Sequence, residues 1–193
     1  MAEFLYYSKN AVTSGSFIKD NLMEAGRMDI AINVLISVFF LSHDIRKDVK
    51  LHLIFDGPPN PPVHILIEYD EKLPISKKDV AGLIKRILHK CPKEKGQIVN
   101  PMPGCFVEKK SFEALIKELD ESGKNVFVLD KKGEDIRDLK LKGNEVFVLG
   151  DQDGFPDDKR RLLKRIDKVS VSPKILFASQ VLTIVHNEID RQA

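Results

Sequence analysis

Three turns, each following a short apolar run, carry the residues best placed for ligand chemistry. They lie at residues 129–130, 148–154 and 169–173. Ligands of parallel sheets bind outside the carboxyl ends of the strands, so these turns are candidate binding loops if the runs before them are strands. The glycines in the second turn would let a ligand approach the backbone, although a Gly-Asp turn is also common structural punctuation. From the residues alone both interpretations stay open.

Standard catalytic signatures are missing from the chain. It has no GxGxxG, P-loop, HExxH or GxSxG pattern. Its two cysteines, Cys91 and Cys105, form no CxxC pair and have no histidine cluster near them, which fits neither a zinc site nor a disulfide framework. We therefore expect no metal and a reducing, cytoplasmic setting.

Composition limits the partners and the number of domains. The 193 residues, 42% of them hydrophobic, suffice for one well-buried domain. Lys and Arg total 31 against 29 Asp and Glu, so an RNA partner would need a local basic surface. The longest apolar stretch, residues 30–41, is interrupted by Asn33 and Ser37 and is shorter than the roughly 20 residues that span a bilayer. We expect no membrane segment and no secretory signal.

The hydrophobic pattern predicts βα units around a parallel sheet, because apolar runs alternate with helical spacing. Residues 93–104 are rich in Pro, Gly, Lys and Asn and predict a linker or mobile loop, and residues 131–133 predict a polar turn. Helices are expected at residues 27–41, 80–88, 111–119, 157–166 and 175–190. Strands are expected at residues 2–8, 49–55, 63–69, 105–108, 125–129, 145–149 and 168–171.

The expected last helix is apolar on nearly all sides. A 3,4 spacing joins Ile175, Ala178, Leu182, Val185 and Ile189, yet Leu176, Phe177, Val181 and Ile184 are apolar as well. Such a helix must bury apolar side chains on two opposite faces. One face can pack on the sheet of its own chain and the other on a second copy, which favours a homodimer. The alternative is a helix fully buried within a monomer.

Eight segments stand out by their order and spacing: AGRMD (25–29), FFLSHDIRKDV (39–49), PPNPPV (58–63), PGCFV (103–107), GEDIRD (133–138), VFVLGDQDG (146–154), VSVSP (169–173) and FASQVLTIVHNEIDR (177–191). In register, they resemble the archaeal tRNA pseudouridine-54 N1-methyltransferases, the TrmY family of the SPOUT superfamily. The resemblance covers essentially the whole chain.

This resemblance implies one SPOUT methyltransferase domain over residues 1–193, an α/β fold with a mostly parallel central sheet. Residues 1–100 would be an N-terminal extension, and residues 101–193 a knotted half that binds the cofactor. There the last helix passes through a loop and forms a C-terminal trefoil knot, an exception to the rule that chains do not knot. The implied cofactor is S-adenosylmethionine (SAM), held by backbone groups of three loops, which explains the missing fingerprint. These loops map to Leu129, Leu149, Gly150, Ser170, Val171, Ser172, Ile175 and Leu176.

In the implied reaction, the protein contributes mainly by placing the two reactants and supplies few reacting groups. The N1–H of pseudouridine is lost as the nitrogen attacks the methyl group of the donor, so no metal is required and placement of the reactants is the main contribution. A carboxylate or a water accepts the proton. Within AGRMD, we expect Asp29 to be catalytic and Arg27 to hold a phosphate or the base. The alternative is an Arg-Asp pair that only caps the helix.

A tRNA partner requires basic contacts. We expect His43, Arg46 and Lys47 to contact phosphates, since Lys and Arg supply most of the non-specific affinity for nucleic acid. A denser cluster fits better the solvated face of a helix whose leucines point inward. It contains Lys159, Arg160, Arg161, Lys164 and Arg165.

Two residues depart from the family pattern. Gln152 stands where many relatives carry His, and Val181 where they carry Cys, so no role for a thiol is expected. Two other functions stay open: pseudouridine N1-methylation of another RNA, such as small-subunit ribosomal RNA, and a non-catalytic module that binds SAM or RNA. Turnover separates the module from an enzyme, whereas binding does not.

Overall fold

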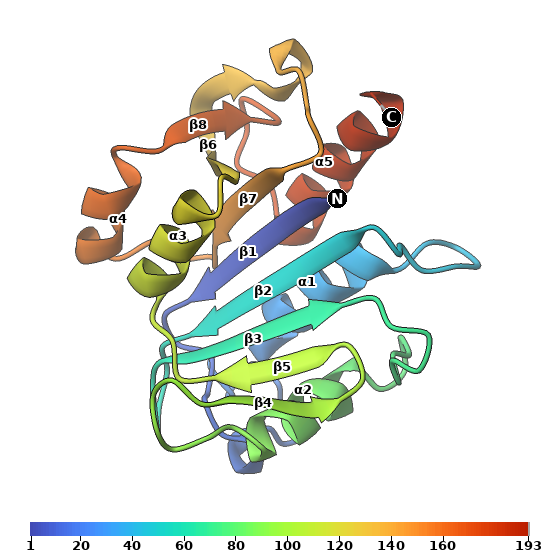
Figure 1. Cartoon of the computed structure of the whole chain (residues 1–193), viewed down its shortest axis with the longest axis vertical. Helices are drawn as coiled ribbons and strands as arrows, with labels where there is room; N and C mark the ends of the chain where they lie inside the picture. The colour runs from blue at the N-terminus through green and yellow to red at the C-terminus, as the bar shows by residue number, and fades with distance from the viewer. Residues whose placement is uncertain (193) are drawn as a thin grey trace.

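The computed structural model describes residues 1–192, which form one mixed eight-stranded sheet in the order β4-β5-β3-β2-β1-β7-β6-β8 (Figure 1). Neighbouring strands from β2 through β1, β7 and β6 to β8 run parallel, and the β2-β3, β3-β5 and β5-β4 pairs are antiparallel. The strands are β1 (Ala2–Ser8), β2 (Val49–Phe55), β3 (Val63–Glu68), β4 (Ile98–Met102), β5 (Cys105–Glu108), β6 (Asn125–Asp135), β7 (Glu145–Gly150) and β8 (Asp167–Ser170).

Helices cover both faces of this sheet. One face is covered by α1 (Met28–Phe39), α2 (Val80–His89) and α5 (Ala178–Gln192), and the other carries α3 (Phe112–Glu121) and α4 (Asp157–Leu163) (Figure 1). Two short 3-10 helices, η1 (Gly15–Phe17) and η2 (Ile136–Asp138), lie in the connections. The result is a three-layer α/β arrangement, as the alternation of strand and helix patterns predicted.

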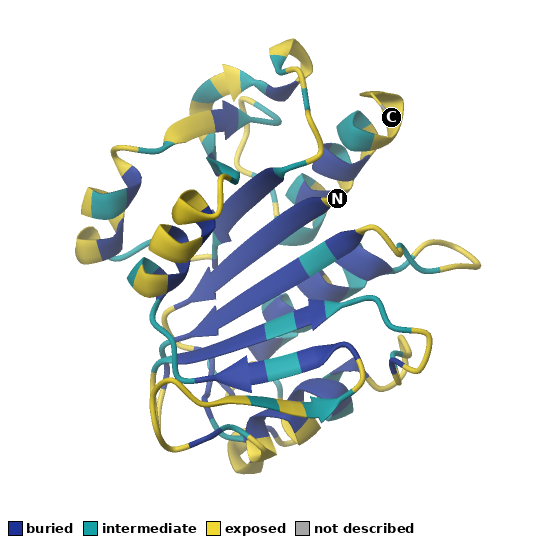
Figure 2. Ribbon diagram, viewed as in Figure 1, coloured by how far each residue is buried: buried dark blue, intermediate teal, exposed yellow. Residues whose placement is uncertain are grey.

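The core lies on both sides of the central strands. In β1, Phe4 and Tyr6 join the cluster under α1, α2 and α5, whereas Leu5 and Tyr7 join the cluster under α3 and α4. Alternate side chains of a strand point to opposite faces, so a strand covered on both faces is apolar throughout. This explains why β1, β2 and β7 are almost wholly dark blue in Figure 2.

Local contacts define where helices begin. Ser111 caps α3, because its side chain accepts a hydrogen bond from the N–H of Ala114 at 3.3 Å. Gly26 precedes α1 with φ +69°, and a Cβ there would lie 1.7 Å from the carbonyl oxygen of Asn10. Only glycine therefore permits this contact between the start of α1 and the loop after β1.

Three predicted boundaries are wrong. Residues 93–104 are not all loop, because β4 pairs with β5 within them. The polar turn at residues 131–133 lies inside β6, which extends to Asp135 by pairing a second time with β8. The last helix begins at Ala178 instead of residue 175, and Ile175 and Leu176 line a cleft with the ends of β6 and β8. The first two differences arise from strand pairing between residues that are distant in the sequence. Local hydrophobic periodicity does not reveal such pairing.

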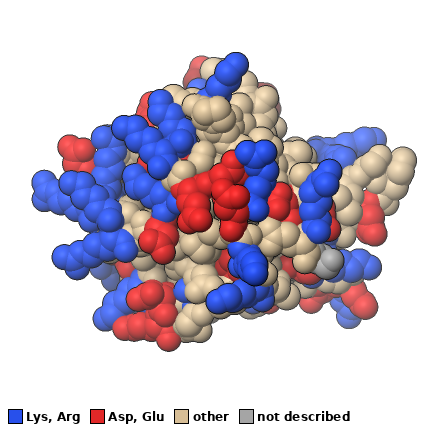
Figure 3. Space-filling view, turned by 90° about the horizontal axis from the view of Figure 1, so that it is seen from above, with Lys and Arg blue, Asp and Glu red and all other residues tan. Residues whose placement is uncertain are grey.

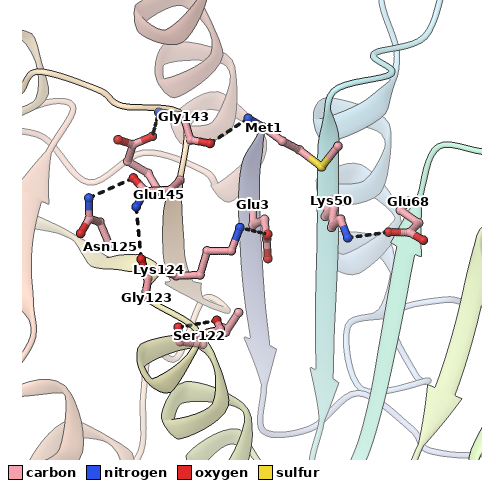
Figure 4. Close-up of polar contacts among 12 residues, drawn as sticks. Met1, Glu3, Lys50, Glu68, Ser122, Gly123, Lys124, Asn125, Gly143 and Glu145 are labelled. Atoms are coloured by element: carbon pink, nitrogen blue, oxygen red, sulfur yellow. Dashed lines mark hydrogen bonds and ion pairs between the residues drawn. The ribbon is translucent and has the colours of Figure 1, made fainter.

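The two ends of the parallel strands, which we call the amino edge and the carboxyl edge of the sheet, carry different groups. At the edge where the parallel strands begin, the amino group of Met1 donates to the carbonyl of Gly143 at 2.8 Å, and Lys124 pairs with Glu3 at 2.7 Å (Figure 4). The candidate binding loops all lie at the opposite, carboxyl edge. In residues 1–192 no helix has the length and apolar character needed to cross a membrane.

Candidate active site

A cleft of about 320 Å³ lies at the carboxyl ends of β6 and β8. Its walls come from the end of β6, the segment after β8, and the first turns of α5. Five predicted cofactor residues line it, namely Leu129, Val171, Ser172, Ile175 and Leu176. The structure thus brings together residues that are almost 50 positions apart in the chain.

An irregularity in β6 opens the sheet at this cleft. Val169 of β8 pairs with Leu129 and again with Glu134, so residues 130–133 leave the ladder. Where they rejoin it, a Cβ on Gly133 would lie 2.5 Å from the backbone of Lys168 and Val169. The two backbones can pass this closely only at a glycine. Such irregularities are common beside binding sites because they free backbone groups and redirect side chains.

The segment after β8 presents free backbone donors. Within residues 1–192, the N–H groups of Ile175 and Leu176 have no hydrogen-bond acceptor, whereas the neighbouring Lys174 and Phe177 N–H groups bond to side chains. The hydroxyl of Ser170 donates to the carbonyl of Ser172 at 3.1 Å and so fixes the turn. Free N–H groups beside an apolar wall suit a ligand that carries acceptor atoms and an aromatic ring.

The other three predicted cofactor residues, Leu149, Gly150 and Ser170, do not line this cleft, although Leu149 and Gly150 end β7 and Ser170 ends β8 beside it. A Cβ on Gly150 would meet backbone atoms of Gly154 at 3.2 Å. The structure therefore gives a different reason for this glycine from the one predicted: the turn of its own chain folds over it.

Asp151 joins the loops after β1 and β7. Its carboxylate accepts hydrogen bonds from the hydroxyl of Ser8 at 2.9 Å and from the N–H of Lys9 at 3.1 Å. Its other oxygen accepts from the N–H of Asp153 at 3.0 Å. Sequence reasoning missed this link, although applying the strand-end rule to β1 as well would have pointed to Ser8.

Arg27 and Asp29 form a bidentate ion pair at the start of α1, with both N···O distances 3.0 Å. The hydrogen bonds from Arg27 lower the pKa of the Asp29 carboxyl, which is therefore ionised at neutral pH. Both side chains are about one-third exposed, and Asp153 of the β7 loop adds to the electrostatic field at Arg27. The pair thus lies at the carboxyl edge, in reach of solvent.

The three predicted RNA contacts lie elsewhere. His43, Arg46 and Lys47 follow α1 and precede β2, so the roughly 18 Å length of a 12-residue helix separates them from Arg27. Arg46 is also occupied, because its guanidinium binds Asp190 of α5 through contacts of 2.7 and 2.6 Å. The structure does not bring these residues to the carboxyl edge.

Lys and Arg side chains gather at one end of the molecule, on the side of α3 and α4 (Figure 3). In α4 and directly after it, Arg160, Arg161, Lys164 and Arg165 are exposed, while Leu163 is buried. Lys159 differs: it is buried and forms ion pairs with Glu113 and Asp158. Most of this cluster is the solvated helix face that the sequence favoured.

A scan against protein families matches residues 1–193 to the family described as "Putative SAM-dependent RNA methyltransferase". The chain belongs to this family. The family predicted from the resemblance is thereby confirmed, as is its dependence on SAM.

Curated relatives match this family member over its full length. The tRNA (pseudouridine(54)-N(1))-methyltransferase of Methanococcus aeolicus is 36% identical, over 99% of this chain and 98% of the relative. The enzymes of that name from Methanocaldococcus jannaschii and Methanocella arvoryzae are 33% and 36% identical, each over 100% of this chain and over 98% and 100% of the relative.

One solved structure also superposes on this methyltransferase. Nep1 from Archaeoglobus fulgidus, bound to S-adenosylhomocysteine, gives a TM-score of 0.67 at 13% identity, covering 100% of this chain and 98% of that one. The predicted α/β fold with a mostly parallel sheet is confirmed. Within residues 1–192, no group of three or more His, Cys, Asp or Glu side chains is arranged to hold a metal ion.

Proposed function

We propose that this protein transfers the methyl group of SAM to N1 of the pseudouridine at position 54 of tRNA. The observation that carries the proposal is its full-length similarity, at 33 to 36% identity, to archaeal enzymes named for that reaction. As a tRNA-modifying enzyme, it would act in the cytoplasm as one domain over residues 1–193, with the cofactor bound in residues 101–193.

The cleft at β6 and β8 fits SAM in its chemistry. Leu129, Val171 and Leu176 supply apolar walls, and the free N–H groups of Ile175 and Leu176 supply donors. Leu149, Gly150, Ser170 and Ser172 would shape the rest through their backbones. The bound donor supplies an activated methyl group, and the residues of the chain hold and orient the two reactants.

We further propose that the last helix closes a trefoil knot. Two contacts support it: the side chain of Gln192 accepts a hydrogen bond from the N–H of Leu141 and donates to the carbonyl of Leu139, each at 3.0 Å. These two hydrogen bonds hold the end of α5 against the connection between β6 and β7.

Asp29 is the candidate proton acceptor, and Arg27 the candidate contact for the RNA. The carboxylate is ionised, as a base must be, and its side chain is partly exposed, so a substrate atom can approach it. The competing role also has support, because Arg27 is the N-cap residue of α1 and an acid in the first turn stabilises a helix. His43 and Lys47 stay predictions as RNA contacts.

A homodimer completes the proposal. Ile175 and Phe177 are 84% and 78% exposed in the single chain. Ile175 also lines the cofactor cleft, so a partner copy packed on this segment would cover the cleft from solvent. Exposed apolar side chains in a group are typical of such an interface.

The test is methyl transfer from labelled SAM to archaeal tRNA transcripts that carry uridine or pseudouridine at position 54, followed by nucleoside mass analysis. Methylation of the pseudouridine transcript alone is the expected result. Transfer to neither transcript, with normal SAM binding, would overturn it in favour of another RNA target or a non-catalytic module.

A further inference from the structure

A second cleft, of about 610 Å³, lies outside the cofactor site. It forms between the loop after β1, the proline-rich loop after β2, and the segment that follows α2. None of its lining residues belongs to the cofactor cleft or to the Arg27–Asp29 pair. We refer to it as the lysine cleft, because Lys93, Lys95 and Lys109 line it.

The lysine cleft is positively charged. Of the described residues that line it, three are lysines and none is an acid. Within residues 1–192, no ion pair is formed by Lys93, Lys95 or Lys109, unlike Lys110, which is paired with Glu108 and Glu118. The amine of Lys109 donates one hydrogen bond, to the carbonyl of Asn60, and keeps further donors for a ligand. Uncompensated lysines around one hollow form a site for a polyanion.

The walls of this cleft are rigid and partly apolar. Pro59, Pro61 and Pro62 form one side, and Leu88 and Pro92 the other. The buried hydroxyl of Thr13 fixes the proline-rich loop, since it donates to Gly57 at 3.0 Å and accepts from the N–H of Asn60 at 2.9 Å. A preformed hollow with flat apolar walls accepts a ribose or a base while the lysines contact the adjoining phosphates.

The cleft continues the edge at which the reaction is proposed. The N–H of Val12 donates to the carbonyl of Ala25 at 3.2 Å, and that of Thr13 to the carbonyl of Pro58 at 2.9 Å. These bonds fasten the loop that begins at Ser8 to both the AGRMD segment and the lysine cleft. The lysine cleft and the Arg27–Asp29 pair are therefore joined through one loop at the same end of the strands.

We propose that the lysine cleft binds the ribose-phosphate backbone of tRNA beside the methylated nucleotide. The inference rests on the proposed function for the identity of the RNA. It assigns a substrate contact to residues 59–62, within the PPNPPV segment, and to residues 91–95, of which residues 93–95 belong to the predicted linker or mobile loop.

The first test replaces two charges that lie in the cleft. The Lys93→Gln/Lys95→Gln variant is expected to bind tRNA about tenfold more weakly at 0.1 M salt, and to lower the slope of log Kd against log salt by about 2. Its matched control is Lys140→Gln/Lys142→Gln, two exposed lysines with the same spacing that lie before β7 at the opposite edge. Filter binding over a salt series measures both quantities, and calorimetry with SAM checks that the cofactor cleft is unchanged.

The second test uses a thiol that the chain already carries. Cys91 is partly exposed and lines the lysine cleft, whereas Cys105 is fully buried. Burial raises the pKa of both thiols, that of Cys105 to about 12, so a maleimide at pH 8.5 should label Cys91 alone. Saturating tRNA is expected to slow this labelling at least several-fold, and SAM alone is expected to leave it unchanged.

The outcomes separate this inference from the proposed function. Unchanged tRNA affinity in the cleft variant, or full labelling of Cys91 in the presence of bound tRNA, overturns the lysine cleft even if position 54 is methylated. Conversely, a cleft variant that loses tRNA, in a protein that methylates neither transcript, supports the cleft and refutes the reaction. A wild-type chain that binds no tRNA overturns both.

Discussion

Asp29 and Arg27 face each other across the first turn of α1, and mutation separates their two possible roles. Asp29→Asn is expected to lower the rate of methyl transfer by about 10²-fold or more, the usual loss for a general base, with SAM affinity unchanged. Single-turnover kinetics and calorimetry measure the two effects.

The matched control for Asp29→Asn is Asp190→Asn. It removes an equivalent bidentate pair, the one with Arg46, at the other edge of the sheet. If both variants keep normal turnover, Asp29 only supports the helix start, and the proton passes to water or to another group.

Gly150 is the residue whose substitution most directly tests the cofactor loops. The Cβ of an alanine would lie 3.2 Å from the backbone of Gly154, tighter than ordinary contact, and valine adds two methyl groups there. Gly150→Val is therefore expected to displace the turn after β7 and to abolish SAM binding in calorimetry, with Gly150→Ala causing a smaller loss. Wild-type affinity in the valine variant would contradict the placement of this loop at the cofactor.

Some residues of the candidate sites could be predicted from the sequence and others could not. Leu129 and Val171 lie in turns that the strand-end rule marked, whereas Leu176 was implied by the family resemblance, and the fold brings all three to one cleft. Lys93 and Lys95 gave no such signal, since their role depends on a proline-rich loop over 30 residues earlier in the chain. A charged side chain in a loop can be assigned to a binding site only when the structure shows which residues lie opposite it.

A buried row of polar side chains crosses the sheet at the scale of elements. Glu3 of β1 contacts His52 of β2 at 3.1 Å, His52 contacts His64 of β3 at 2.9 Å, and His64 contacts Glu108 of β5 at 3.0 Å. Lys124 and Lys110 close the two ends, the first visible in Figure 4. Buried polar groups that are all bonded specify strand register, because a slip would leave each of them unpaired.

This row makes the stability of the fold depend on pH. Burial lowers the pKa of His64 to about 4, against the hydrogen bond to Glu108, which raises it. The unfolded chain takes up a proton on this ring below about pH 6.5, and the folded chain does not until about pH 4. The free energy of unfolding should therefore fall as the pH drops through this window, by on the order of 2 kcal/mol at pH 4.5.

Glu3 acts in the same direction at lower pH. Burial raises its pKa, but hydrogen bonds from His52 and Lys124 lower it more, to about 2. Its contribution is present above about pH 4.5 and is lost as the pH falls towards 2.

Burial lowers the pKa of His186 to about 4 as well, so His64 and His186 contribute to the same window. In urea unfolding at pH 7, 5.5 and 4.5, His64→Leu should therefore reduce the pH dependence by about half, and His43→Leu, at an exposed histidine, should leave it unchanged. An equal slope in His64→Leu would contradict this assignment.

Elements were predictable where their own residues decide their structure. The strands at residues 2–8, 49–55 and 105–108 were expected with the bounds that the structure has, because each is a short apolar run flanked by turn residues. The far part of β6 and the whole of β4 were missed. Both are half-exposed segments whose strand conformation depends on hydrogen bonds to distant partners.

At the scale of the whole molecule, the sheet combines two halves that differ in pairing. The half from β2 to β8 is parallel and carries the candidate active site at its carboxyl edge. The half from β3 to β4 is antiparallel, which the sequence did not predict, and it brings Lys109, directly after β5, back to that same edge. Because the chain reverses direction at β3 and again at β5, the antiparallel half also contributes to the surface that we propose binds RNA.

The oligomeric state is the property of the whole molecule that the last helix decides. We expect light scattering at micromolar concentration to give twice the monomer mass, because Phe177, 78% exposed, and the apolar residues around it need a second cover. Phe177→Asp should reduce the mass to that of one chain and weaken SAM binding, since the same segment lines the cofactor cleft. Ile98→Asp, at an apolar residue that is 60% exposed on β4, the edge strand at the far side of the sheet from β8, should keep the dimer. A wild-type monomer that binds SAM and methylates tRNA would refute the shared cleft.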